Sequence, residues 1–477
     1  MRRGRSIVCA TALVAASVLA VRAQTRPPAD RDILDLVRLA RELPPDFAAD
    51  ALIRLAGSPR IVDNDWRREL IDDAFGRAHA AQAPYARASN LGVPPDTRQG
   101  AELFSYTSAL TRLTLQVRAA QLMLLVDRDH ARELFESIDL HLSPGVCEDA
   151  LVPAVDEYYS AASLFARQSF GDNRGDAIRF LQLYLWRAHL PSEMPAIARA
   201  VQRFRARPDE APYLEGVIRW ILDKGSLDPR GFSSADLDIV SRVADLQKAD
   251  HDLGVTGSHL MEALREYLVA QLKGPRCSDS VTEALTPPSF NAALRRVNAE
   301  DEVKPIDGVR VFPSRLLGVA RIDFYWQTPE ARQLRLDLLQ LHGPDRLPLP
   351  MKVRRAREWR DEAERMLVDL DLWQGHREAS DRDFFYQKSV LFTELTDLIP
   401  PSPVRTRALR AFVEFLRQAD LDRERRALWF AFVMRLLELA HGEYRSEILT
   451  ALEQSHHPVL SLYARMQRTI AVNGRSD

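Results

Sequence analysis

The chain has 477 residues, 46% of them hydrophobic, and its 65 basic side chains are set against 67 acidic ones. This nearly neutral charge is spread along the whole length. It argues against a nucleic-acid partner, because binding to phosphates needs clustered Lys and Arg. The length exceeds that of one ordinary hydrophobic core, so we expect two or three domains or one extended array.

The first 23 residues have the pattern of a secretory signal peptide. Three arginines precede an apolar run at 7–21, and Val21-Arg22-Ala23 then places small residues where a signal peptidase cleaves. As a helix the run would measure about 22 Å, shorter than the roughly 30 Å hydrocarbon core of a bilayer. An uncleaved anchor is the alternative. We expect cleavage after Ala23, a periplasmic or secreted product, and no transmembrane span in the mature chain.

From residue 30 onward the dominant hydrophobic period is that of an α-helix. The first apolar stripe consists of Ile33, Leu36, Val37, Ala40 and Leu43. Similar stripes, separated by capping and breaking residues, recur about eighteen times along the chain. Asp127 before one helix and Ser402-Pro403 before another are examples of these start signals.

The helix pairs recur at roughly 35–45 residues, close to the period of HEAT or tetratricopeptide arrays, but no residue signature recurs with them. We therefore predict an all-α fold of irregular stacked helix hairpins, similar in kind to an α-solenoid. One exception is a short extended or β segment near 309–327, where apolar and polar residues alternate.

These patterns divide the chain at changes of period and composition. We predict a signal peptide at 1–23, a flexible mature N-terminus at 24–29 and an N-terminal helical-hairpin domain at 30–274. A connector at 275–327 would contain the extended segment. A C-terminal helical domain at 328–472 and a flexible tail at 473–477 would complete the chain.

Compact motifs for known chemistry are missing from the sequence. There is no P-loop, dinucleotide-binding glycine pattern, HExxH, GxSxG or EF-hand loop, so no cofactor is predicted. Two cysteines, Cys147 and Cys277, remain after signal cleavage. In an oxidising compartment they could form one disulfide, and the alternative is two separate thiols.

The densest group of metal-ligand residues is HGEYRSEILTALEQSHHP near the C-terminus. One helix of about a dozen residues would hold its two ends roughly 20 Å apart, so His441 cannot share a metal with His456 or His457 through that helix alone. Glu453 lies one turn before His457, but a metal site with two visible ligands is weak. We predict no metal, with His456, His457 and Glu453 as weak candidates.

Three other clusters combine charged with aromatic residues. Asp156-Glu157-Tyr158-Tyr159 could line a sugar-binding groove, although packing is the simpler explanation. The basic run at 352–365 has the pattern of a solvated helix face with ion pairs one turn apart. In DRDFFYQK at 381–388 the aromatic residues are expected in the core, and Tyr386 and Lys388 are the only functional candidates.

Fold type and missing motifs together favour one function and leave a second open. The first is an exported helical scaffold or protein-interaction module, with a protein or peptide as its partner. The alternative is an exported all-α enzyme that acts on polysaccharide or another envelope polymer. We assign no catalytic residues, because the sequence identifies none.

Overall fold

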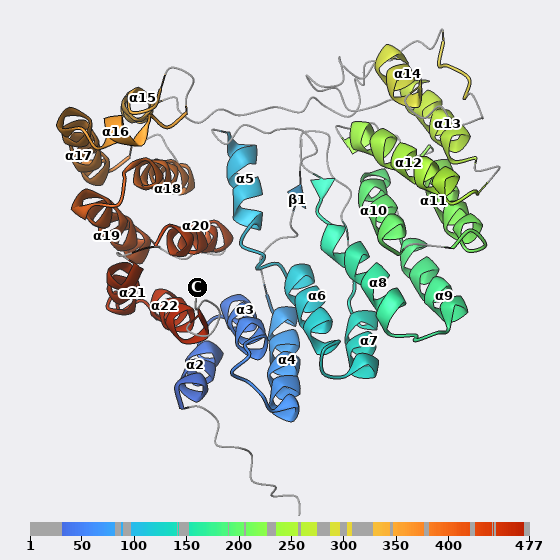
Figure 1. Ribbon diagram of the computed structural model, residues 1–477, viewed down its shortest axis with the longest axis horizontal. Helices are drawn as coiled ribbons and strands as arrows, with labels where there is room; N and C mark the ends of the chain where they lie inside the picture. The colour runs from blue at the N-terminus through green and yellow to red at the C-terminus, as the bar shows by residue number, and fades with distance from the viewer. Residues whose placement is uncertain are drawn as a thin grey trace, which may run out of the picture.

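The computed structural model describes most of the chain. The described residues are 31–81, 87–88, 97–140, 142, 152–188, 190–204, 207–226, 235–255, 259–273, 287–295, 303–307, 328–343, 347–375, 381–419, 425–440, 442 and 445–471. Within them, helices follow one another with short links, and the predicted all-α fold of stacked helices is confirmed (Figure 1).

The N-terminal arm, α2 to α14, is a row of helices stacked along the chain. Neighbours and next neighbours pack on each other, as α3 does on α4, α4 on α6, and α8 on α10. The helices of this arm are α2 (Arg31–Arg41), α3 (Pro45–Ala56), α4 (Asn64–His79), α5 (Arg98–Tyr106), α6 (Arg112–Met123), α7 (Arg128–Glu136), α8 (Asp156–Gln168), α9 (Arg174–Leu185), the 3-10 helix η1 (Pro191–Glu193), α10 (Met194–Phe204), α11 (Ala211–Gly225), α12 (Ala235–Asp252), α13 (Leu260–Lys273) and α14 (Pro287–Arg295).

The C-terminal arm, α15 to α22, is a second row of the same kind. Here α15 packs on α17 and α18, and α21 packs on α22. The helices are α15 (Pro329–Gln340), α16 (Met351–Arg354), α17 (Arg357–Leu372), α18 (Asp381–Leu398), α19 (Pro403–Gln418), α20 (Arg426–Leu439), α21 (Arg445–Glu453) and α22 (Pro458–Ala471).

The two arms meet near the ends of the chain. Helices α2 and α3 pack on α22, and α5 packs on α20, so the first and last described helices are neighbours (Figure 1). Ring contacts join the arms at this junction: Phe47 lies 5.2 Å from Phe430, and Phe104 lies 4.5 Å from Phe432, measured between centroids. The arms therefore form one open arc with a continuous hydrophobic core.

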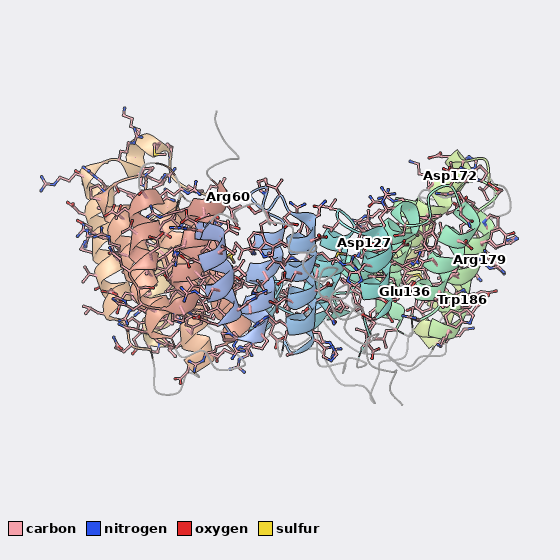
Figure 2. The ribbon with its side chains drawn as sticks, turned by 90° about the horizontal axis from the view of Figure 1, so that it is seen from below. Arg60, Asp127, Glu136, Asp172, Arg179 and Trp186 are labelled. Atoms are coloured by element: carbon pink, nitrogen blue, oxygen red, sulfur yellow. The ribbon has the colours of Figure 1, made fainter. Side chains whose placement is uncertain are left out.

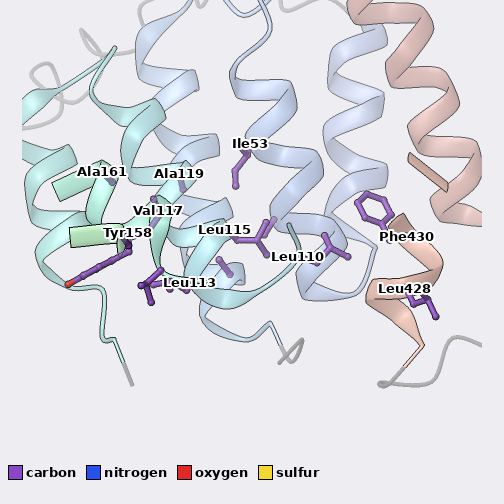
Figure 3. Close-up of a cluster of buried hydrophobic side chains, with 14 of the residues drawn as sticks. Ile53, Leu110, Leu113, Leu115, Val117, Ala119, Tyr158, Ala161, Leu428 and Phe430 are labelled. Atoms are coloured by element: carbon purple, nitrogen blue, oxygen red, sulfur yellow. The ribbon is translucent and has the colours of Figure 1, made fainter. Parts of the chain in front are cut away.

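The core consists of the helix faces that the apolar period indicates. In α2 the buried residues are Ile33, Leu36, Val37 and Ala40, and Leu43 just beyond it is also buried, which confirms the predicted stripe. Figure 3 shows the core near the junction, where Ile53, Leu115, Leu428 and Phe430 come from segments far apart in the chain. Burying apolar area of this kind is the main favourable term in folding.

Side-chain caps begin several helices where the sequence predicts them. The Asp127 carboxylate accepts hydrogen bonds from the backbone N–H groups of Asp129 and His130 at the start of α7. The Ser402 hydroxyl accepts one from the backbone N–H of Arg405, and Pro403 occupies the first position of α19. Each cap satisfies a backbone donor that the helix itself leaves unpaired.

The predicted extended segment at 309–327 lies outside the described residues. Elsewhere, a two-residue antiparallel ladder pairs β1 (Arg87–Ala88) with β2 (Val152–Pro153). Helix α14 falls inside the range 275–327 that the sequence assigns to a connector, and it packs on α12. Helices α14 and α15, which flank the C-terminal part of that range, lie toward opposite ends of the arc (Figure 1).

Candidate functional site

The C-terminal metal candidates have other partners in the structure. Glu453 forms an ion pair with Arg468, with 2.7 Å between Oε1 and Nε. The ring of His457 packs against Trp429 at 5.0 Å between centroids, and burial together with the charge of Arg417 lowers the pKa of His457. His456 is exposed.

In the part of the chain that the structure describes, no group of three or more His, Cys, Asp or Glu side chains is placed to hold a metal ion. His441 and Glu443 of the same sequence cluster lie outside the described residues. So do Cys147 and Cys277, the predicted disulfide pair.

The cluster at 156–159 is part of the core rather than of a groove. Tyr158 and Tyr159 are fully buried in α8. The Tyr159 hydroxyl donates to Glu193 Oε2 at 2.6 Å, and burial followed by this carboxylate raises the pKa of Tyr159 well above its usual value. Asp156 accepts a hydrogen bond from Arg199 Nε at 2.7 Å. Packing is therefore the interpretation that these contacts support.

The aromatic residues of 381–388 also belong to the core. Phe385 and Tyr386 are buried in α18. Lys388 is buried as well, and its Nζ donates to the carbonyl oxygens of Asp371, at 3.0 Å, and Trp373, at 2.6 Å, at the C-terminal end of α17. Burial lowers the pKa of Lys388. A cation at this position complements the helix terminus, which is a structural role.

The basic run at 352–365 is in part the ion-paired helix face that its spacing predicts. Arg357 Nε lies 3.6 Å from Asp361 one turn later, and Arg365 Nη2 lies 3.8 Å from Glu362 one turn earlier. All four side chains are exposed, so these pairs contribute little to stability.

A buried carboxylate at the junction of the arms accepts three side-chain hydrogen bonds. Asp50 has no exposed surface. Arg54 Nε, Arg118 Nη1 and the Tyr463 hydroxyl donate to it at 2.6, 2.7 and 2.6 Å. Burial alone would raise the pKa of Asp50, but the two guanidinium groups and the hydroxyl outweigh it and keep the pKa below its usual value. With its acceptor positions occupied, this carboxylate is structural.

Exposed aromatic side chains come from Tyr213 of α11 and from Trp186, which directly follows α9 and lies in the outer part of the N-terminal arm (Figure 2). Trp186 is 44% exposed, Tyr213 is 62% exposed, and Leu183 is also exposed. The ring of Trp186 lies 4.6 Å from that of Trp220 at an interplanar angle of 55°. Gln182 Nε2 donates to the carbonyl oxygen of Tyr213 at 3.0 Å, which ties the two helices together. The aromatic side chains are therefore exposed on an ordered surface.

A glycine separates the two aromatic side chains of α11. Tyr213 and Trp220 are seven residues apart, or about 10.5 Å along the helix. Between them, Gly216 is exposed, and a Cβ added there would meet no atom within 4 Å. Lys224, one turn beyond Trp220, holds its Nζ 4.8 Å from that ring. We call the set of Leu183, Trp186, Tyr213, Gly216, Trp220 and Lys224 the aromatic face.

Two carboxyl groups are buried behind the aromatic face. Glu215 of α11 and Asp250 of α12 share a hydrogen bond, and both side chains are buried. Burial, followed by the neighbouring Glu215 carboxyl, raises the pKa of Asp250 to about 7. A proton shared by two such groups relieves their repulsion. This pair therefore makes the contact between α11 and α12 at Glu215 and Asp250 sensitive to pH.

Sequence reasoning did not identify the aromatic face. Tyr213 and Trp220 look like ordinary apolar positions, and only their place on the helix distinguishes them. The buried positions of α11 are Leu214, Val217, Ile218 and Ile221 among others, which places Tyr213, Gly216 and Trp220 toward the other side. Their separation from the buried positions is the sequence signal that could have predicted the aromatic face.

Comparison of the chain with protein-family models, with curated proteins and with solved structures found no match in any of the three. Among the described helices, none combines the length and the apolar character that crossing a bilayer requires. The geometry of this chain is therefore the basis for inferring its function.

Proposed function

We propose that the chain is an exported helical scaffold that binds a protein or peptide partner through its aromatic face. The observation that carries this proposal is the exposure of Trp186 and Tyr213 on an ordered helix pair. The Trp186 ring already packs against Trp220, so it loses little conformational freedom on binding. Trp and Tyr are enriched at protein interfaces and at the residues that dominate binding energy.

The arrangement around Gly216 supports an inserted side chain from the partner. Tyr213 and Trp220 lie on either side of this open position, so a side chain of the partner could fit between two rings. The ammonium group of Lys224 lies beside Trp220 and would favour an acidic group close to the inserted one. An extended or helical peptide with an apolar residue next to Asp or Glu fits these features.

The remainder of the molecule has the features of a support for this face. The buried carboxylate Asp50 is fully bonded, and the exposed ion pairs such as Arg357–Asp361 lie on solvated helices. Stacked helices hold an exposed surface in a fixed shape, which is how helical arrays commonly bind partners.

Site-specific photo-crosslinking tests the proposal. A photo-reactive phenylalanine analogue replaces Tyr213 in one variant and Val62, which is even more exposed at 81%, in the control. We expect a discrete covalent adduct from position 213 in cells that export the full chain, and none from position 62. Absence of an adduct at 213, or the same adducts from both positions, would contradict the proposed binding face.

Export is tested separately by N-terminal sequencing of the protein recovered outside the cytoplasm. The proposal expects the mature chain to begin at Gln24, because cleavage follows Ala23. A protein that stays in the cytoplasm with Met1 intact would contradict export. The crosslinking experiment would still test the binding face independently.

A further inference from the structure

A second exposed patch lies on the C-terminal arm, apart from the aromatic face. It consists of residues 347–357, which join α15 to α17 and include the single turn α16. Three apolar side chains of this segment are largely exposed: Leu347 at 61%, Met351 at 41% and Val353 at 43%. The solvent side of this arm thus presents three aliphatic or thioether groups within seven residues.

This segment is held in a fixed shape by hydrogen bonds. The backbone N–H of Gly343 donates to the Leu347 carbonyl at 2.8 Å. Arg354 donates from Nε to the Leu349 carbonyl and from Nη1 to the Leu398 carbonyl, both at 2.8 Å. Leu349 itself packs against the core. The exposed apolar groups therefore belong to an ordered segment whose other side is attached to the arm.

The charge of the segment has one sign. Residues 347–357 read LPLPMKVRRAR and contain four basic residues, no acidic residue and no aromatic residue. Lys352, Arg355 and Arg357 are exposed. Acidic groups follow directly in α17, where Glu358 is exposed next to Arg357 and Asp361 lies 3.6 Å from Arg357. We call Leu347, Met351, Lys352, Val353, Arg355 and Arg357 the basic apolar patch.

We propose that the basic apolar patch docks on the surface of an anionic phospholipid bilayer. Its apolar side chains enter the interface between headgroups and acyl chains, while Lys352, Arg355 and Arg357 meet the lipid phosphates. Apolar tips interleaved with cations on one short segment match that interface on both counts. This inference is independent of the aromatic face and its partner.

Vesicle co-sedimentation of the full-length mature chain tests the docking. Wild type should sediment with phosphatidylcholine vesicles that contain about one third phosphatidylglycerol, and should remain in the supernatant with phosphatidylcholine alone. Binding should weaken as salt screens the charges. Equal binding to both vesicle types, or none to either, overturns the proposal. Binding to an acidic protein without binding to anionic vesicles would also overturn the proposal.

Matched variants distinguish binding through the basic apolar patch from attraction by the net charge of the whole protein. Lys352→Glu/Arg355→Glu should weaken binding to anionic vesicles by about thirtyfold or more. Arg38→Glu/Arg179→Glu changes the net charge equally at exposed positions elsewhere and should bind as wild type does. Equal losses in the two pairs would mean that net charge alone drives binding, and would overturn the assignment to this patch.

The apolar contribution needs its own variant. Met351→Ser/Val353→Ser keeps every charge and removes two exposed apolar side chains, so folding should be unaffected. We expect about tenfold weaker binding to anionic vesicles if these side chains enter the bilayer. Unchanged binding would show that the cations act alone, and would overturn the insertion of the patch.

Discussion

The hydroxyl of Tyr463 donates a 2.6 Å hydrogen bond to the carboxylate of Asp50, which lies 413 residues away in the chain. Tyr463 belongs to α22 and Asp50 to α3, so this contact joins the two arms. Arg118 of α6 donates to the same carboxylate, and all three helices meet around it. The contact explains how an array of stacked helices brings its first and last helices together.

Substitutions at this contact should lower the free energy of unfolding. We expect Asp50→Asn to cost about 3 kcal/mol, because it leaves two guanidinium groups without their buried partner. Tyr463→Phe should cost about 1.5–3 kcal/mol, the value of one hydrogen bond to a charged group. Denaturant unfolding measures both, with Asp35→Asn at an exposed ion pair as a control that should cost less than about 0.5 kcal/mol.

The pH dependence of this contact has a defined sign. Because the folded-state pKa of Asp50 is held below its usual value, its contribution to stability is present above the pKa of the unfolded chain. It is lost as the pH falls through the folded-state pKa. The stability difference between wild type and Asp50→Asn should therefore shrink in acid. A difference that grows as the pH falls would contradict this account.

The buried pair Glu215–Asp250 should make the free energy of unfolding depend on pH in the opposite direction. The pKa of Asp250 is raised to about 7, so the folded chain holds a proton that the unfolded chain releases. The contribution of this pair to wild-type stability should then decline as the pH rises from about 4 to 7. Asp250→Asn removes this decline and should be more stable than wild type by about 2–4 kcal/mol at slightly alkaline pH. Identical pH profiles for the two proteins would contradict the shared proton.

Gly216 should be dispensable for folding. It lies in the interior of α11, and a Cβ would meet no neighbour. Gly216→Ala should therefore raise the free energy of unfolding by about 0.5–1 kcal/mol, because Ala loses less backbone freedom in a helix. Gly76→Ala at the comparable open position of α4 should give the same gain. A loss at Gly216 alone would mean that the fold itself needs this glycine.

His456 occupies a backbone conformation that favours glycine, with φ at 56°. His456→Gly should stabilise the protein by about 1 kcal/mol, since the left-handed region is unfavourable for residues that carry a Cβ. Thermal unfolding measures this gain. If His456 instead held a metal, zinc would raise the melting temperature of the wild type but not that of His456→Gly. The variant would then melt at a lower temperature than the wild type when zinc is present.

Hydrophobic period predicted the local structure well, because burial of one helix face is a property of each segment. The stripe from Ile33 to Leu43 and the cap at Ser402 are examples. Tyr158 and Tyr159 were correctly expected in the core for the same reason. The long-range contacts could not be predicted, since nothing near Asp50 in the sequence indicates Tyr463 or Arg118.

The aromatic face could not be predicted for a related reason. Whether Trp186 or Tyr213 is exposed depends on which helices cover α9 and α11, and that is settled by tertiary packing. The basic run at 352–365 shows the same limit. Its α17 part forms the expected ion pairs, whereas the exposure of Met351 and Val353 follows from how Arg354 holds the preceding turn.

The most direct test of the proposed function is the dissociation constant of the partner crosslinked at position 213, measured with wild type, Gly216→Leu and Gly76→Leu. Both variants add the same side chain to open space on a helix, but only Gly216→Leu fills the position between Tyr213 and Trp220. We predict that Gly216→Leu binds the partner at least about tenfold more weakly, while Gly76→Leu binds as wild type does. Equal affinities for all three proteins would contradict binding through the aromatic face.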